Sequence, residues 1–309
     1  MDFVKRDFPA PGVARLTIHR PEVRNALNQA VREQLAEQFS TLGRNAEVRT
    51  IILTGGDTVF AAGADLTEFA DKNAVQMQQR TVHLLWQAIA ECPKPIVAAV
   101  NGYALGGGCE LAMHADIIVA GRNATFGQPE IRVGVMPGAG GTPRLARAVG
   151  EFQAMKYLLT GLPFKGDEAF AMGLASEVVD DEQVQARALE LAQLIAGMPP
   201  LAATQIKEVV LAGQDASLDT ALLLERKAFN LLFASQDQKE GARAFLENRP
   251  PNDTGNGSRS APSHSACAGM QCSRACPATP PSRVQNPGDT MHTATSRPTL
   301  LGIVGAGLM

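Results

Sequence analysis

The chain has 309 residues and a formal net charge of −3, and 45% of its residues are hydrophobic. This charge argues against a strongly basic surface for nucleic acid, and no apolar run reaches the roughly 18 residues of a membrane-spanning helix. Five cysteines, an odd number, suit a reducing compartment better than a disulfide framework. We therefore expect a cytoplasmic globular protein whose partners include neither nucleic acid nor membrane.

Apolar spacing predicts alternating strands and helices up to about residue 143 and mainly helices after it. Segment 13–19 alternates as a strand does, and apolar residues recur every three or four positions from Leu27 to Leu42, as on one face of a helix. A helical stripe is predicted to run from Leu145 to Phe152. Short apolar runs predict buried strands at 48–54, 95–100 and 117–120. This order predicts an α/β fold with a sheet-containing core and a helical C-terminal lobe.

The composition changes after residue 249. Residues 250–309 hold 8 of the 19 prolines and no Phe, Trp or Tyr. A segment without aromatic anchors buries little apolar surface, so we expect this tail to be disordered. Its three cysteines lack the CxxC spacing of a zinc site, and we expect no metal there.

Three segments combine an apolar run, small residues and an acid: FAAGADL (60–66), NGYALGGGCEL (101–111) and FGQPEIRVGVMPGAGG (126–141). In the second segment, three glycines follow a predicted strand and precede a predicted helix, whose first amides have no partner inside the helix. Ala64 offers another amide in a small-residue turn. Two amides from separate turns can bind one carbonyl oxygen. A phosphate loop is the competing interpretation, but no GK[ST] follows the glycines.

The same segments contain two glutamates. Glu110 lies three residues after Gly107, and Glu130 stands between a proline and an isoleucine. Taken singly, each is better explained as a surface acid, whereas the three segments together favour a site. Two partly desolvated carboxylates that lie near each other have their proton affinities pushed apart, which supplies an acid and a base. Gln128 is predicted to orient Glu130 by hydrogen bonding.

These motifs resemble those of the crotonase superfamily, and within it the enoyl-CoA hydratases. The resemblance implies a spiral of ββα units over residues 1–195, a helical trimerisation lobe over 196–249 and a tail over 250–309. It also implies trimers, often paired into hexamers, that act on acyl-CoA thioesters. The matching stretches are HRPEVRNALN (19–28), FAAGADL, KPIVAAVNGYALGGGCELA (94–112), FGQPEIRVGVMPGAGGTPRL (126–145) and AFLENR (244–249).

The resemblance also implies roles for single residues. Ala64 and Gly107 match positions whose backbone N–H groups form an oxyanion hole. Glu110 matches the carboxylate that activates water, and Glu130 matches the one that exchanges a proton with the substrate α-carbon. The implied reaction adds water across the 2,3 double bond of a 2-enoyl-CoA to give a 3-hydroxyacyl-CoA. It implies no metal and no separate cofactor, since CoA is part of the substrate.

Further positions are implied to contact CoA: Arg24, Ala26, Leu27, Ala62, Asp65, Leu66 and Phe245. The last of these is implied to reach the CoA of a neighbouring subunit. Hydratases often carry a lysine three positions beyond it, where this chain has Asn248. Candidates for the acyl pocket, for which core packing is an equally good explanation, are Leu66, Phe69, Trp86 and Val135.

Three other functions stay open. An enoyl-CoA isomerase typically uses one acid, so the pair of glutamates favours a hydratase. The motifs also resemble the dehydroadipyl-CoA hydratase of phenylacetate catabolism, whose second substrate carboxylate calls for a basic acyl pocket; we identify no such pocket from the sequence. An RNA-binding crotonase homologue is less favoured, because the predicted helix at 31–47 contains no lysine.

The last ten residues, LLGIVGAGLM, resemble the first strand and turn of a dinucleotide-binding domain, as at the start of a 3-hydroxyacyl-CoA dehydrogenase. That fold needs a third glycine, a helix and a further strand. We therefore expect that this stump binds no NAD by itself. The tail is interpreted as a read-through product or a truncated fusion.

Overall fold

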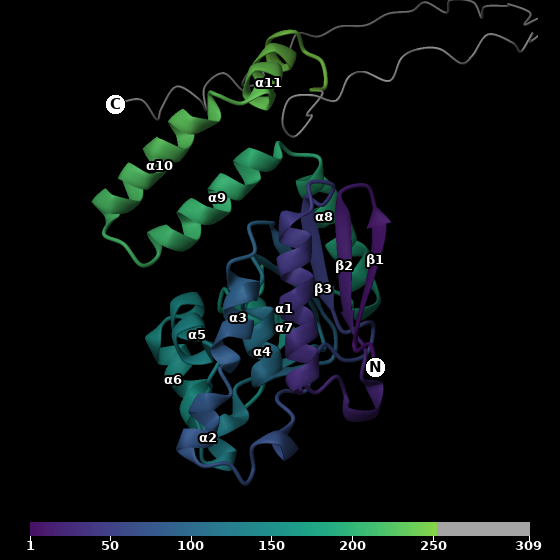
Figure 1. Ribbon diagram of the computed structural model, residues 1–309, viewed down its shortest axis with the longest axis vertical. Coiled ribbons are helices and arrows are strands. Elements are labelled where there is room, and N and C mark those ends of the chain that lie inside the picture. Colours follow the sequence, from purple (N-terminus) through teal and green to yellow (C-terminus); the bar gives the residue numbers. More distant parts are fainter. Residues whose placement is uncertain (252–309) are drawn as a thin grey trace, which may run out of the picture. The chain divides into compact units, whose positions relative to one another are not determined.

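The computed structural model describes residues 1–251, whose strands form two sheets (Figure 1). The larger sheet contains, in spatial order, β1 (Val4–Ala10), β2 (Val13–Ile18), β3 (Thr50–Thr54), β4 (Ile96–Val100), β6 (Ile117–Gly121) and β9 (Glu177–Val179). The smaller sheet contains β5 (Tyr103–Leu105), β7 (Thr125–Gly127) and β8 (Phe164–Lys165). Within the larger sheet, β1 and β2 are antiparallel and the other pairs are parallel. The predicted tail cysteines and the dinucleotide-like stump lie outside the described residues.

The chain passes repeatedly from the larger sheet to the smaller sheet and then into a helix. β4 and β5 precede α4 (Gly107–Ala112), and β6 and β7 precede α5 (Gly141–Val149). Because β4 pairs with β6 and β5 pairs with β7, each turn of the chain stacks on the turn before it. This is a spiral of ββα units, and the predicted α/β class is confirmed.

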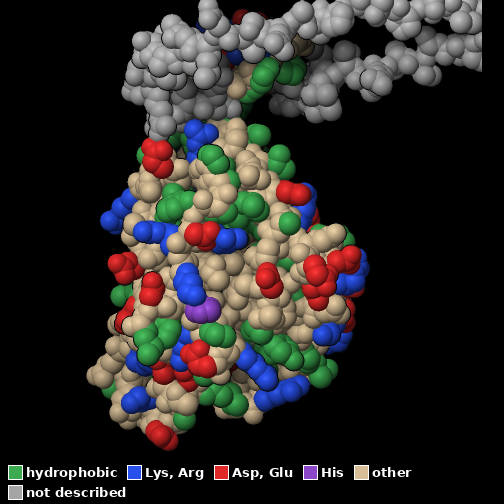
Figure 2. All heavy atoms as spheres, turned by 90° about the vertical axis from the view of Figure 1, so that its right-hand side faces the viewer, with side chains coloured by type: hydrophobic (Ala, Val, Ile, Leu, Met, Phe, Trp, Pro, Cys, Tyr) green, Lys and Arg blue, Asp and Glu red, His purple; other side chains and the backbone are tan. Residues whose placement is uncertain are grey.

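The described surface carries charges of both signs. Figure 2 shows acidic and basic side chains interspersed on one face, with apolar side chains between them. The helix predicted at 31–47 is α1 (Gln29–Arg44), in which Arg32 is buried and no lysine occurs, so this helix has no continuous basic face. In the part of the chain that the structure describes, no helix is both long and apolar enough to cross a bilayer.

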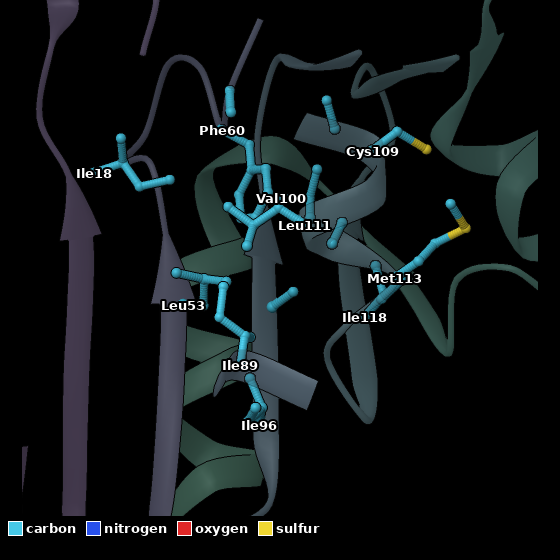
Figure 3. Packing of buried hydrophobic residues seen from close by; sticks show 14 of the residues in the cluster. Ile18, Leu53, Phe60, Ile89, Ile96, Val100, Cys109, Leu111, Met113 and Ile118 are labelled. Atoms are coloured by element: carbon cyan, nitrogen blue, oxygen red, sulfur yellow. The ribbon is translucent and has the colours of Figure 1, made fainter. Parts of the chain in front are cut away.

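Alternation along the strands divides the core into two layers. Ile18, Leu53 and Val100 lie on one face of the larger sheet and meet the helices α3 (Val82–Ala90) and α4 (Figure 3). Ile52 and Val97 lie on the opposite face and pack against α8 (Val184–Ala196). Figure 1 shows α1 and α8 on opposite sides of the strands. β4 is packed on both faces and leads directly into β5, so the glycine-rich turn after β5 starts close to a rigid support.

Three helices follow α8: α9 (Pro200–Gly213), α10 (Leu218–Leu232) and α11 (Gln236–Leu246). α9 and α10 pack side by side (Figure 1). The buried ammonium group of Lys207 in α9 lies 2.8 Å from Asp116 and donates to the Lys94 carbonyl at 2.9 Å. This contact joins α9 to the start of β4 and the residue before β6. The helical C-terminal part agrees with the sequence prediction.

One predicted helix is wrong. The stripe from Leu145 to Phe152 is interrupted at Gly150, where α5 ends and α6 (Glu151–Thr160) begins. Gly150 has φ +81° and ψ 161°, which no α-helix contains. Leu145 is buried, whereas Phe152 is 88% exposed. The remaining helical elements are η1 (Pro21–Val23), η2 (Leu66–Glu68), α2 (Ala74–Gln79), η3 (Pro129–Val133), α7 (Gly166–Ala171) and η4 (Asp181–Gln183).

Candidate active site

The amide of Ala64 lies in an extended turn paired with Leu27. Leu27 donates its N–H to the carbonyl of Gly63 at 2.7 Å, and Asp65 donates its N–H to the carbonyl of Leu27 at 3.1 Å. Successive N–H groups of an extended segment point to opposite sides, so the N–H of Ala64 points away from Leu27. Among the described backbone groups it has no hydrogen-bond acceptor.

The amide of Gly107 begins α4, so it has no acceptor inside that helix. A Cβ atom placed on Gly107 would lie 3.5 Å from the nitrogen of Ala64 and 3.9 Å from Oε2 of Glu110. The structure therefore brings both predicted amides and the first predicted acid to one point.

Glycines, which have no side chain, allow α4 to lie this close to the segment that carries Ala64. A Cβ atom on Gly108 would lie 2.1 Å from the carbonyl oxygen of Ala61, far inside any real contact. Gly106 has φ +48°, and a Cβ atom there would lie 2.8 Å from Oε1 of Glu130. The glycines thus allow α4 to approach the segment that carries Ala64, and allow Glu130 to approach the glycine turn.

Glu110 is buried and held by two backbone amides. Its Oε1 accepts the N–H groups of Ala139 at 2.7 Å and Gly141 at 2.8 Å. Burial raises the pKa of Glu110, while these hydrogen bonds and the charges of Arg32 and Arg144 oppose the rise. Oε1 is engaged by the loop before α5, and Oε2 lies on the side of Gly107. The two amides therefore favour the ionised form of Glu110, although burial outweighs them and leaves its pKa above that of an ordinary glutamate.

Glu130 lies in η3, and its pKa and orientation are set by burial, by the charge of Glu110 and by Gln128. Burial raises the pKa of Glu130 to about 7, and the negative charge of Glu110 adds to the rise. With its amide nitrogen turned toward Glu130, the buried Gln128 donates to Oε1 at 3.1 Å and to Oε2 at 3.2 Å. When Glu130 is protonated, the carbonyl of the same amide can accept its O–H. Gln128 thus contacts Glu130 in a way that suits either protonation state.

A left-handed turn supports the segment that carries Ala64. Arg24 and Asn25 have φ values of +52° and +58°, which residues other than glycine rarely adopt. The buried amide of Asn25 donates to the carbonyls of Gly55 and Val59, and the carbonyl of Arg24 accepts the N–H of Ala62 at 3.0 Å. Asn25 lies in the motif RNALN, but the motif alone does not reveal these contacts.

Arg20, which the sequence analysis missed, joins two of the residues implied to contact CoA. Its Nη1 donates to the carbonyl of Ala26 at 2.6 Å and lies 3.4 Å from Oδ2 of Asp65. Leu66, the next residue, is exposed at the start of η2. Phe245 lies on α11 and is 57% exposed.

His114, also missed, packs behind Glu110. Its Nδ1 lies 2.8 Å from the carbonyl oxygen of Glu110, and its ring stacks on Trp86 with centroids 5.2 Å apart. Burial lowers the pKa of His114 to about 4, so the neutral imidazole donates from Nδ1. His114 lies in the turn that follows α4, four residues after Glu110, and that spacing was the available signal. Of the acyl-pocket candidates, Trp86 is buried, while Val135 is exposed.

Two further expectations concern cysteine and metal. Cys109 is buried as a free thiol, and burial raises its pKa to about 12, so it fits the expected role of a small buried residue. Within residues 1–251, no group of three His, Cys, Asp or Glu side chains is arranged to hold a metal ion.

The sequence of residues 10–256 matches the family model for enoyl-CoA hydratase/isomerase. The chain belongs to this family. It is 43% identical over 243 residues to a 2,3-dehydroadipyl-CoA hydratase from Escherichia coli, covering 79% of this chain and 95% of that protein. It is 39% identical over 240 residues to a short-chain-enoyl-CoA hydratase from Clostridium acetobutylicum, covering 77% and 92%.

Solved structures of the enoyl-CoA hydratase/isomerase family share the fold of this chain. The crystal structure of an enoyl-CoA hydratase from Bacillus anthracis superimposes with a TM-score of 0.79 at 34% identity, covering 82% of this chain and 100% of that chain. The crystal structure of an enoyl-CoA hydratase from Mycobacterium tuberculosis superimposes with a TM-score of 0.74 at 37% identity, covering 82% and 99%. The crotonase-like fold implied by the sequence is therefore confirmed.

Gly108→Ala is expected to destabilise the protein by about 1–3 kcal/mol, because the added methyl group collides with the Ala61 carbonyl and forces α4 to shift. Chemical denaturation followed by circular dichroism measures the change. The matched control is Gly138→Ala, where a Cβ atom meets nothing within 4 Å, and which should change stability by no more than about 0.5 kcal/mol. Equal stability of the two variants would contradict the steric argument.

Proposed function

We propose that Ala64, Gly107, Glu110 and Glu130 form the site that adds water to a 2-enoyl-CoA thioester. One observation supports this proposal most directly: a single point beside Gly107 lies 3.5 Å from the nitrogen of Ala64 and 3.9 Å from Oε2 of Glu110. Two amide donors and a carboxylate at one point are what the attack of water on a conjugated thioester requires.

Membership of the family and relatives of about 40% identity that are named as hydratases agree on the reaction. The chain is an enzyme of the enoyl-CoA hydratase type, a carbon–oxygen lyase that gives 3-hydroxyacyl-CoA. Its substrate is an acyl-CoA.

The two amides act on the thioester carbonyl. When water attacks C3, electrons move from the 2,3 double bond through C2 onto the carbonyl oxygen. The N–H groups of Ala64 and Gly107 donate to that oxygen, and they stabilise its developing negative charge more than the neutral ground state. A single donor of this kind typically contributes about 2.7–4 kcal/mol to the transition state. These dipoles supply the electrophilic assistance, so we propose that the enzyme uses no resident metal or cofactor.

The two glutamates divide the proton transfers. Glu110, whose Oε1 accepts the N–H groups of Ala139 and Gly141, takes a proton from the attacking water. Glu130, whose pKa is raised to about 7, gives its proton to C2. One O–H bond of water and the π bond of the substrate break, and a C3–O bond and a C2–H bond form. Glu110 ends protonated and Glu130 ionised, so a proton passes from Glu110 back to Glu130 before the next turnover. An isomerase that moves one proton between C2 and C4 needs no activated water, so the anchored carboxylate of Glu110 favours hydration.

The CoA moiety is proposed to lie along the turn that joins Arg24 and Ala26–Leu27 to Ala62, Asp65 and Leu66. Arg20 holds the two sides of this turn together through Ala26 and Asp65. The two relatives differ in the acyl chain that their names give: a short chain in one and a chain with a second carboxylate in the other. Which of these two acyl chains this enzyme prefers depends on the charge next to the acyl end of the site.

We propose residues 1–195 as the catalytic unit and 196–249 as a lobe through which three chains associate, singly or as paired trimers, with Phe245 reaching a neighbour's CoA. The support is the exposed apolar surface of α10, which includes Leu218, Phe229 and Leu231. Large exposed apolar patches mark interaction sites. The free thiols of Cys92 and Cys109 support the proposed cytoplasmic location.

Glu110→Gln and Glu130→Gln are each expected to lower kcat for crotonyl-CoA by about 10²- to 10⁴-fold, because each removes one proton-transfer group. The loss of absorbance of the conjugated thioester measures the rate, and calorimetric binding of CoA should stay nearly unchanged. Glu33→Gln, an exposed position on α1, is the matched control. Near-normal hydration by either site variant rejects its assignment.

The rate constant kcat/KM is expected to fall as the pH rises above about 7, since Glu130 then loses the proton that C2 must receive. On the acid side it should fall when Glu110 is protonated, at a pH above that of an ordinary glutamate because its pKa is raised. The pair titrates together. A profile from pH 4 to 10 tests this, and a flat alkaline limb in the wild type would contradict it.

The intact protein is expected to have a mass of about three or six times the chain mass of 32.7 kDa in light scattering after size exclusion. Leu231→Glu should weaken the association because it places a charge in an apolar contact. Val75→Glu, at an exposed apolar position of α2, serves as control. A wild-type monomer at micromolar concentration would contradict the trimer.

A further inference from the structure

Glu68 in η2 joins the segment that carries Ala64 to helix α1, and its carboxylate takes no part in the hydration steps. Its Oε1 accepts the backbone N–H of Gln29, the first residue of α1, at 2.6 Å. Its Oε2 lies 3.2 Å from Nη1 of Arg32 and 2.8 Å from Nη2 of Arg80. Arg32 belongs to the buried face of α1 and is only 7% exposed. Both carboxylate oxygens of Glu68 are therefore hydrogen-bonded, to three groups from outside η2.

The groups around Glu68 favour its ionised form. Burial raises the pKa of Glu68, but the backbone N–H at the start of α1 and the charges of Arg80 and Arg32 outweigh burial and leave the pKa lowered. A negative charge also interacts favourably with the N-terminal end of a helix. The carboxylates of Asp65 and Glu110 act on Arg32 as well, so the positive charges of this cluster are matched. Glu68 therefore binds α1 as an anion.

The segment 63–68 is attached to the start of α1 at both of its ends. At one end, the backbone on either side of Ala64 pairs with Leu27. At the other end, the side chain of Glu68 binds Gln29, two residues after Leu27. Because Ala64 lies between these two attachments, both of them set the direction of its N–H group.

Apolar packing does little to hold η2 in place. Of its three described residues none is buried, and Leu66 is 49% exposed. The hydroxyl of Thr67 donates to Asp65 at 2.7 Å, a contact inside the turn itself. Glu68, in contrast, reaches a different element of the fold. The position of η2 therefore depends on the polar contacts of Glu68.

We propose that Glu68 is a positioning residue for the oxyanion hole: by binding the start of α1 and two arginines, it fixes η2 and so orients the N–H of Ala64 toward the thioester oxygen. This inference rests on the proposed hydration at Glu110 and Glu130. Oxyanion stabilisation requires donors that are already in place when the charge develops, and a displacement of about 1 Å costs about 100-fold in rate. In this role Glu68 touches neither the substrate nor the reacting atoms.

The test uses 3-oxobutanoyl-CoA, which binds either as the keto form or, after C2 has lost a proton to solvent, as an enolate whose charge is shared by the thioester oxygen. The enolate has an absorbance band that the keto form lacks. The enolate-to-keto ratio of the saturated, intact protein therefore reports how well the two amides bind a negative oxygen.

Glu68→Gln is the main variant, since glutamine has the shape of glutamate and keeps an acceptor for Gln29 but lacks the charge that binds Arg32 and Arg80. It should lower the enolate-to-keto ratio, and kcat for crotonyl-CoA, by about 10- to 100-fold. KM should change less than kcat, because the oxyanion forms only in the transition state.

Asp116→Asn is the matched control, because Asp116 is held in the same way as Glu68. It accepts one backbone N–H, that of Ile96 at 2.7 Å, and it binds the ammonium group of Lys207 at 2.8 Å. In both ion pairs the cation is 8% exposed and the carboxylate 21% exposed. Asp116→Asn should therefore lower the midpoint of chemical denaturation, as Glu68→Gln does, but leave the enolate-to-keto ratio and kcat unchanged.

A second pair of variants keeps the test decisive if Glu68→Gln does not fold. Arg80→Met removes one guanidinium group and leaves Arg32 on Glu68, so the ratio should fall, but by less than in Glu68→Gln. Arg80→Lys keeps a charged donor and should recover part of that loss.

A ratio that Glu68→Gln and Asp116→Asn lower equally would overturn the proposal and make Glu68 a residue that only stabilises the fold. A ratio that neither Glu68→Gln nor Arg80→Met changes would overturn it as well, and in both cases hydration itself would stand. If the wild type neither hydrates crotonyl-CoA nor binds 3-oxobutanoyl-CoA as the enolate, the proposed function fails instead.

Discussion

The site depends on one steric constraint, the close contact between the first turn of α4 and the segment 61–64. Gly108 leaves no room for a Cβ atom against the Ala61 carbonyl. Because that contact is so short, the free amide of Gly107 comes next to that of Ala64, and Glu110, one helical turn farther on, reaches the same point. Glycine in a helix costs about 1 kcal/mol relative to alanine. β4, which is packed on both faces, leads into β5, after which the turn starts.

Two residues of the same type acquire different roles from their surroundings. Burial raises the pKa of both Glu110 and Glu130. Glu110 receives two backbone N–H groups and the field of two arginines, which favour its charged form, whereas Glu130 feels the negative charge of Glu110. The asymmetry therefore arises from the loop before α5, which offers its amides to one carboxylate only. The amides of this loop therefore favour the ionised form of Glu110.

The features that could be predicted from the sequence are local ones. Strand alternation, the three glycines between a strand and a helix, and a glutamate one turn later depend on neighbouring residues, so motif and spacing reveal them. Local patterns also mislead. The apolar spacing from Leu145 to Phe152 continues across Gly150, but a left-handed φ at that glycine separates two helices and leaves Phe152 exposed. Periodicity describes which face a residue occupies only while the helix continues.

Residues that act through distant contacts could not be predicted. Arg32 lies on the buried face of α1, between the buried apolar residues Val31 and Leu35. A charged residue within a buried apolar pattern is the signal that the sequence offers of a special role. Its partner is beyond reach of that reasoning, because Glu68 is one of 31 acidic residues in the chain and lies 36 positions away. Only the spiral that places η2 against α1 selects it. A buried charge in a sequence pattern therefore identifies where to look, and the fold alone identifies what it meets.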